Sequence, residues 1–266
     1  MECPKCRMEQ SDGNLLCDYC GIVFAKYRPE APAAAGTAAG PAHATVEPRL
    51  TVYAPLVQPL AAWLRTRLFD VRLEPPAALA GRGVLLVFLA LWGVRLMATS
   101  IESNGVGESF LHLVNLPFHE AGHVLFTPFG DFVRVLGGTL GQLIMPMVCC
   151  LVLLLKTRDP FGAAVGLWWF GENFLDIAPY IDDAGTGELP LLGGNTGEST
   201  PYGFHDWEYL MTETGRLGRE HDLARASQMF GSVLMVLALV WMTVTLYRSW
   251  SVARATRESE QPRRAA

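Results

Sequence analysis

Long apolar segments after residue 83 constrain this chain more than any other feature of its sequence. A helix needs about 20 apolar residues to cross about 30 Å of hydrocarbon. Only 18% of the 266 residues are charged, whereas about 25% is usual in a soluble domain. We therefore expect a mainly α-helical, polytopic membrane bundle of about four to five membrane segments. These segments cover residues 84–101, 110–129, 133–155, 161–181 and 229–247.

The remainder of the chain consists of polar regions around this membrane domain. The Ala- and Pro-rich linker has too few bulky apolar residues to offset the entropy of ordering. The segment after it alternates apolar and arginine side chains, which suits a short amphipathic helix on an anionic membrane surface; an ordinary solvated helix is the alternative. The expected parts are a cysteine-containing unit (1–27), the linker (28–59), an interfacial segment (60–82), the membrane domain (83–250) with a polar insert (182–227), and a basic tail (251–266).

The second apolar segment decides the topology. Asn115 is a suitable N-cap, Pro117 suits a first helical turn, and residues 127–130 are typical of a helix end. The helix between them would have about eleven residues, which is roughly half of a bilayer. If this segment is re-entrant, most Lys and Arg residues of the loops and the tail lie on one side. Because such residues concentrate on the cytoplasmic side, we favour four full spans plus a half-helix.

Two CxxC pairs, Cys3/Cys6 and Cys17/Cys20, are separated by ten residues. Together they offer four thiolates, which suit a tetrahedral structural Zn²⁺ site. Two disulfides or a redox pair are the alternative, but a disulfide within CxxC is strained, and nothing in the sequence suggests a thioredoxin-like βαβ unit. Reduced cysteines favour a cytosolic N-terminus, in a bacterial cytoplasmic membrane. Residues 20–27 resemble the short zinc ribbons that head many bacterial proteins, which implies a small adaptor that binds a protein partner.

The sequence His119-Glu120-Ala121-Gly122-His123 carries the chemistry of the membrane domain. Histidines four residues apart share a helix face, so both imidazoles can bind one Zn²⁺. Glu120 can then act as general base toward a zinc-bound water, whose pKa zinc lowers to about 7. Ionisable side chains in an apolar helix are costly in lipid and by default mark function. The alternative is a polar patch that pairs with other helices.

A catalytic zinc usually has three protein ligands and one open position. Glu172 and Asp176 of the fourth segment share a helix face, and either is a candidate for the third ligand. With Glu172 as ligand, Asp176 can accept a hydrogen bond from a histidine N–H. Asp183 follows as a candidate, and then His205 of the pair His205-Asp206, because a loop can fold over the site. A capping or pairing role is the alternative for each.

Residues 118–123, within an apolar segment, resemble the site-2 protease type of integral-membrane zinc metallopeptidase. In that family an Asp from a later membrane helix, preceded by an Asn and Pro residues, completes the zinc site. Asn173 and residues 182–183 occur here in a similar order, although the usual Asp-Gly pair is absent. The spacing of Glu172 and Asp176 is similar to the third-ligand helix of the gluzincins. The resemblance implies hydrolysis of peptides or membrane proteins in or near the bilayer.

Two other function classes fit part of this pattern. A non-catalytic membrane scaffold or regulatory protein would use the N-terminal ribbon to bind a partner. Intramembrane charge suggests a transporter, but the chain shows no inverted repeat. The net charge of −5 argues against nucleic acid as a partner, because a nucleic-acid binder carries a basic excess.

Overall fold

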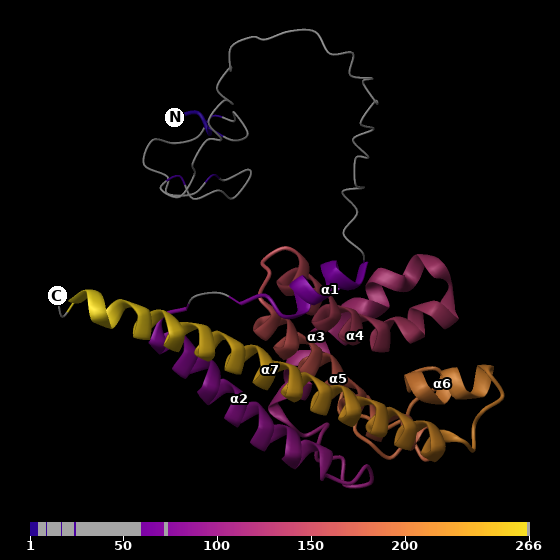
Figure 1. Ribbon diagram of the computed structural model, residues 1–266. Coiled ribbons are helices and arrows are strands. Elements are labelled where there is room, and N and C mark those ends of the chain that lie inside the picture. Colours follow the sequence, from indigo (N-terminus) through magenta and orange to yellow (C-terminus); the bar gives the residue numbers. More distant parts are fainter. Residues whose placement is uncertain (5–8, 10–16, 18–23, 25–59, 72–73, 265–266) are drawn as a thin grey trace, which may run out of the picture. The chain divides into compact units, whose positions relative to one another are not determined.

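The computed structural model describes residues 1–4, 9, 17, 24, 60–71 and 74–264 (Figure 1). The chain divides into two units, Met1–Ala54 and Pro55–Ala266. In the first unit Cys3 and Cys17 are buried. Cys6, Cys20 and the whole linker lie outside the described residues. The zinc ribbon therefore stays a prediction.

The second unit is built from helices, and its described residues contain no strand. This confirms the prediction of a mainly α-helical fold. The predicted segments 133–155 and 161–181 agree closely with two of the helices, whereas the last helix extends well beyond 229–247. The helices are α1 (Leu60–Leu68), α2 (Pro76–Met97), α3 (Phe110–Phe126), α4 (Asp131–Leu155), α5 (Pro160–Asp182), α6 (Asp206–Glu213) and α7 (Glu220–Arg264), with the short 3₁₀ helices η2 (Thr127–Phe129) and η3 (Asp183–Gly185).

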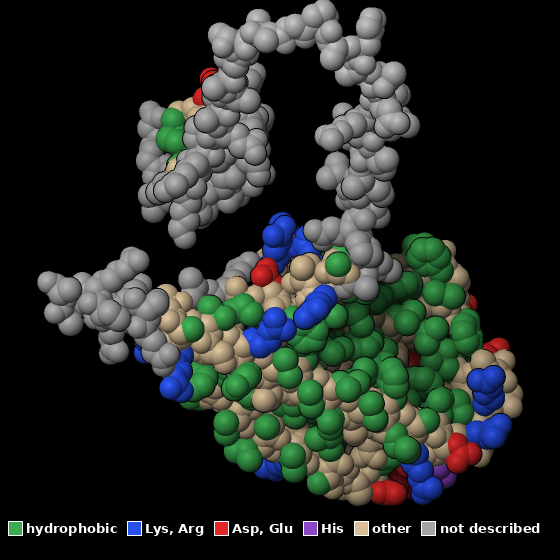
Figure 2. Space-filling model, in the orientation of Figure 1, with side chains coloured by type: hydrophobic (Ala, Val, Ile, Leu, Met, Phe, Trp, Pro, Cys, Tyr) green, Lys and Arg blue, Asp and Glu red, His purple; other side chains and the backbone are tan. Residues whose placement is uncertain are grey.

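Three of these helices, α2, α4 and α7, are long and apolar enough to cross a membrane by length and composition. They carry large apolar side chains on their outer surfaces; Val84 of α2 and Met229 of α7, for example, are 72% and 70% exposed. Figure 2 shows hydrophobic side chains over most of the visible face of this unit. Apolar surface of this extent is typical of contact with a membrane or a partner. The helices are compatible with a membrane protein.

Helix α3 begins earlier than predicted. Its N-cap is Ser109, so Asn115 and Pro117 lie inside a helix of 17 residues, and the prediction of Asn115 as N-cap is wrong. The reason is a tertiary contact. Asn115 is 1% exposed, and its side-chain amide forms hydrogen bonds with side chains of α5 and not with the backbone of its own helix. At about 1.5 Å per residue α3 is about 25 Å long. Neither α3 nor α5 is among the three helices that qualify as spans.

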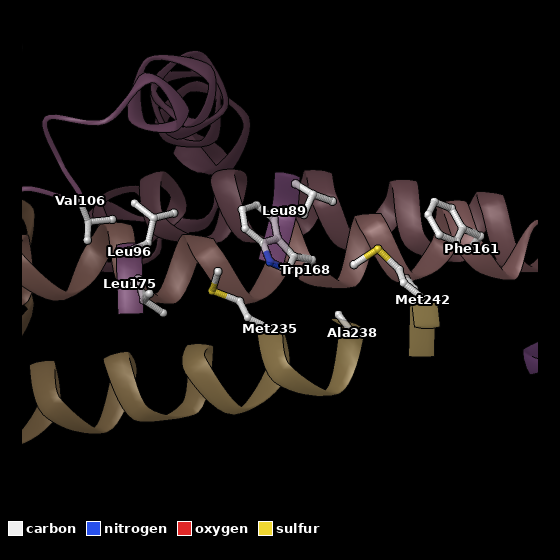
Figure 3. Close-up of a cluster of buried hydrophobic side chains, with 10 residues drawn as sticks. Leu89, Leu96, Val106, Phe161, Trp168, Leu175, Met235, Ala238 and Met242 are labelled. Atoms are coloured by element: carbon white, nitrogen blue, oxygen red, sulfur yellow. The ribbon is translucent and has the colours of Figure 1, made fainter. Parts of the chain in front are cut away.

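Helix α5 lies at the centre of the unit, between α4 and α7. Its side chains Trp168 and Leu175 pack with Met235 and Met242 of α7 in the main apolar core (Figure 3). A Cβ added at Gly231 of α7 would lie 2.4 Å from the carbonyl oxygen of Gly171, so the two backbones touch there. Because lipid tails are as apolar as leucine, such a core is held in a membrane by close packing.

Candidate metal centre

Helices α3 and α4 cross in direct backbone contact. A Cβ at Gly122 would lie 2.0 Å from the carbonyl oxygen of Gly137, and a Cβ at Gly141 would lie 2.2 Å from that of Phe118. Gly137 and Gly141 have the spacing of the GxxxG pattern that lets membrane helices approach closely. This crossing brings the histidine face of α3 against α4.

Three side chains meet at this crossing: His119 and His123 of α3, and Asp206 at the start of α6. The Asp206 Oδ2 atom lies 2.9 Å from His119 Nε2 and 3.2 Å from His123 Nε2. The three ligand atoms lie within 4.8 Å of one another, so the group could hold a metal ion. His119 and Asp206 are largely buried, with 9% and 7% exposure. We call His119, His123 and Asp206 the triad.

The outer nitrogens of both histidines face acceptors. His119 Nδ1 lies 2.8 Å from the amide oxygen of Gln142, and His123 Nδ1 lies 2.9 Å from the backbone carbonyl oxygen of Arg134. Because a carbonyl oxygen only accepts, each Nδ1 carries a hydrogen, and in a neutral imidazole each Nε2 then carries a lone pair. Two lone pairs and one carboxylate oxygen converge in that state. Such an arrangement attracts a cation, either a proton on Nε2 or a metal ion.

Gly138 of α4 lets both histidine rings lie close to the α4 backbone. A Cβ at this position would lie 2.5 Å from His119 Nε2 and 2.6 Å from His123 Nε2, far inside normal contact distances. Any side chain here would therefore collide with the two nitrogens that face Asp206. Two imidazole nitrogens and one carboxylate oxygen are also the donors of catalytic zinc sites that keep one position open. The residues present fit Zn²⁺.

Neighbouring groups hold both the backbone and the carboxylate of Asp206. Its backbone N–H donates to the hydroxyl oxygen of Tyr180, at 2.9 Å, and the Tyr180 ring lies 6.3 Å from that of His119. Burial raises the pKa of the Asp206 carboxyl, but hydrogen bonds from His119 and His123, when these rings are protonated on Nε2, outweigh burial and bring the pKa below its ordinary value. The carboxylate is therefore charged at neutral pH. Glu120 is exposed on α3.

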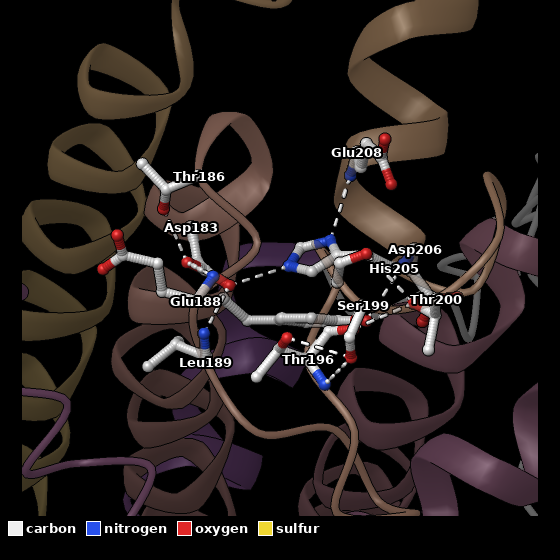
Figure 4. A network of polar contacts seen from close by, with 12 residues as sticks. Asp183, Thr186, Glu188, Leu189, Thr196, Ser199, Thr200, His205, Asp206 and Glu208 are labelled. Carbon is white, nitrogen blue, oxygen red and sulfur yellow. Dashed lines mark hydrogen bonds and ion pairs between the residues drawn. The ribbon is translucent and has the colours of Figure 1, made fainter.

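Asp183 and His205 are two of the predicted candidates for the third ligand. They form a hydrogen bond with each other (Figure 4). His205 Nδ1 accepts from the backbone N–H of Glu208, so it caps α6, and its Nε2 donates to Asp183 Oδ2 at 3.2 Å. Burial raises the pKa of the Asp183 carboxyl, but hydrogen bonds from His205, Thr186 and two backbone N–H groups outweigh it, and the pKa is lowered. We call Asp183 and His205 the latch. It fixes the start of α6, and thereby Asp206.

Glu172 and Asp176, the other predicted ligands, lie in a second buried group with Asn115 and His112, which we call the carboxyl cluster. Asn115 Oδ1 accepts from Trp169 Nε1 at 2.8 Å, so its Nδ2 faces Glu172 Oε2 at 3.1 Å and Asp176 Oδ2 at 3.0 Å. His112 Nδ1 lies 2.9 Å from Asp176 Oδ1. Neither carboxylate belongs to the group of potential metal ligands among the described residues. Among the described residues, the carboxylate that lies beside the two histidines is that of Asp206.

Sequence reasoning thus found the two histidines of the triad and missed its carboxylate. Asp206 is 87 residues away from His119, and the only signal was its place beside His205 in the polar insert. Comparison of the chain with protein-family models, curated proteins and solved structures gives no match. What can be inferred about function depends on the geometry of this site.

Proposed function

We propose that this chain is a membrane-embedded zinc metallopeptidase, similar to the site-2 protease type, that hydrolyses peptide bonds in or near the bilayer. One observation carries the proposal: the two histidines of an HExxH helix and the Asp206 carboxylate bring their ligand atoms together, beside a glycine of α4 that lets the rings approach its backbone. The apolar helices α2, α4 and α7 support a location in a membrane. With α5 as a fourth span and the shorter α3 as a further membrane segment, they would form a bundle of five segments.

His119, His123 and Asp206 would hold the zinc ion. When bound there, Zn²⁺ supplies a Lewis acid for the scissile carbonyl and lowers the pKa of a coordinated water to about 7. Glu120 would act as the general base that accepts a proton from the attacking water, and then as the acid that passes it to the leaving amine. Tyr180 holds the backbone of Asp206, and the Gln142 and Arg134 oxygens hold the two imidazoles, so all three ligands are oriented before a substrate binds.

The N-terminal cysteines form a separate part of the proposal. Cys3, Cys6, Cys17 and Cys20 would bind a second, structural zinc ion, and the resulting ribbon would bind a protein partner in the cytosol. The burial of Cys3 and Cys17 supports a role inside a small folded unit. This zinc must be removed before the triad can be tested.

The test uses the full-length chain with these four cysteines replaced by serine, purified in detergent. We expect one equivalent of zinc by elemental analysis, and loss of that zinc in His119→Ala and Asp206→Ala. Glu120→Gln should retain the zinc but lose cleavage of quenched fluorogenic membrane-spanning peptides in lipid vesicles. If no zinc is bound, the metal centre is wrong. If Glu120→Gln binds zinc and cleaves as well as the parent, hydrolysis by this site is wrong.

A further inference from the structure

Gln142 of α4 connects the triad to the carboxyl cluster. It is 4% exposed, and it is hydrogen-bonded at both ends of its amide. Its Oε1 lies 2.8 Å from His119 Nδ1, and its Nε2 donates to Asp176 Oδ2 at 3.4 Å. One side chain therefore joins a metal ligand on α3 to a carboxylate on α5.

The orientation of this amide is set by Asp176. A carboxylate without a proton only accepts, so it selects the Nε2 end of Gln142 and leaves Oε1 for the histidine. Asp176 is itself held by Asn115 Nδ2 at 3.0 Å and by His112 Nδ1 at 2.9 Å. A fixed sequence of donors and acceptors thus runs from the carboxyl cluster to His119, and it ends with the lone pair on His119 Nε2.

We propose that Gln142 and Asp176 are positioning residues for the metal centre. They hold His119 as the tautomer with hydrogen on Nδ1, and they fix the ring so that Nε2 faces the ion. The inference rests on the proposed metal centre, but it concerns the protein's own hydrogen bonds. Loss of such an outer partner typically lowers metal affinity about 10- to 100-fold.

The two histidines of the motif differ in this respect. His123 Nδ1 bonds to the backbone carbonyl of Arg134, which no side-chain substitution removes. His119 depends on side chains from two other helices. His123 is therefore an internal control for any variant at Gln142 or Asp176.

The first experiment needs no metal. The chain is full-length and metal-free, its four N-terminal cysteines are replaced by serine, and Asp206→Ala removes the carboxylate that competes for a hydrogen at both Nε2 atoms. At about pH 8.5, where histidine is neutral, ¹⁵N chemical shifts of the imidazoles report the tautomer. We expect hydrogen on Nδ1 of both His119 and His123. Adding Gln142→Leu should make His119 a mixture of tautomers and leave His123 unchanged. Hydrogen on Nε2 of His119 before Gln142→Leu is added, or no change after it is added, would overturn the inference.

The second experiment measures zinc affinity by competition with a chelator, and the visible absorption of the Co²⁺-substituted chain. Gln142→Leu should bind zinc about 10- to 100-fold more weakly and should show a changed Co²⁺ band. The double variant Gln142→Glu/Asp176→Asn keeps an acceptor for His119 and a donor–acceptor pair behind it, so we expect it to recover most of the affinity. Asp176→Asn alone should have a smaller effect, because the new amide can still accept.

Glu172→Gln is the matched control. Glu172 is fully buried on the same helix and shares Asn115 with Asp176, but it has no hydrogen bond to Gln142. Its zinc affinity and Co²⁺ band should match those of the parent. Equal affinity in the parent and in Gln142→Leu would overturn the positioning role. If the tautomers are as expected but the parent chain binds no zinc, only the metal centre is overturned.

Discussion

Two buried polar groups of the helical unit, the triad and the carboxyl cluster, are joined by Gln142, and they satisfy their charges in opposite ways. In the carboxyl cluster, nitrogen atoms of Asn115, His112 and Gln142 face the carboxylate oxygens of Asp176. In the triad, the two imidazoles direct lone pairs toward a carboxylate. The cluster therefore holds its charge with protein donors, whereas the triad needs a cation from outside the chain.

The groups also differ in how their carboxylates are supported. Glu172 and Asp176 lie on α5, the central helix, whose packing fixes them directly. Asp206 lies at the start of α6, inside the polar insert, and it depends on Tyr180 and the latch for its place. A change in the insert can therefore disturb the triad while the carboxyl cluster remains intact.

The largest expected effect comes from adding a side chain at Gly138, which lies against the two histidines of the triad. Gly138→Ala places a Cβ 2.5 Å from His119 Nε2 and 2.6 Å from His123 Nε2, so the rings must move away from the ion. We expect zinc affinity to fall by more than about 100-fold, with helix α4 intact because alanine favours a helix by about 1 kcal/mol over glycine.

The matched control for this variant is Gly81→Ala in α2, where an added Cβ has no neighbour within 4 Å. It should leave zinc affinity unchanged, and thermal stability should be unchanged or slightly higher. Zinc affinity is measured by chelator competition, and folding by circular dichroism. Normal zinc binding by folded Gly138→Ala would show that the ion does not lie between the two Nε2 atoms. The triad would then not be the group that needs a cation.

A smaller effect is expected from removing the central donor of the carboxyl cluster. Asn115→Leu leaves the Glu172 and Asp176 oxygens without their shared Nδ2 donor in a buried site. An unsatisfied buried group costs about 1–3 kcal/mol, so we expect unfolding free energy to fall by about 2 kcal/mol or more. Thermal unfolding in detergent measures the loss.

Thr139→Val is the control for this loss, because the Thr139 hydroxyl is buried and has no hydrogen-bond partner among the described residues. Its stability should be unchanged or higher. Equal stability of Asn115→Leu and the parent would mean that the carboxyl cluster does not depend on protein donors.

These contrasts also explain which parts of the molecule the sequence could predict. The apolar segments 133–155 and 161–181 predicted α4 and α5 well, because length and hydropathy are local properties. The HExxH spacing likewise predicted that His119 and His123 share one face of α3. The start of α3 was missed because Asn115 is used by α5 and not by its own helix. Asp206 and Gln142 could not be identified as site residues, since only the folding of the insert and the crossing of α3 and α4 bring them to His119.

The smallest expected effect is a pH dependence of the latch. The folded-state pKa of Asp183 is lowered below its ordinary value of about 3.9, so its contribution to stability is fully present above that value and is lost as the pH falls through the folded-state pKa. We therefore expect residues 183–213 to become more mobile below about pH 4. Hydrogen–deuterium exchange, corrected for the intrinsic exchange rate at each pH, measures this change. Asp183→Asn should exchange faster in this region already at pH 7, with little further change on acidification.

The amides of α5 provide the internal control in the same experiment, because its packing in the core does not involve the latch. If the insert opens while α5 stays protected, the support of Asp206 is separable from that of the carboxyl cluster. Simultaneous opening of both regions in the parent chain would contradict this, since it would mean that the insert and the central helix unfold as one unit. The triad would then be as firmly built as the carboxyl cluster, and the difference between them would lie only in their donors and acceptors.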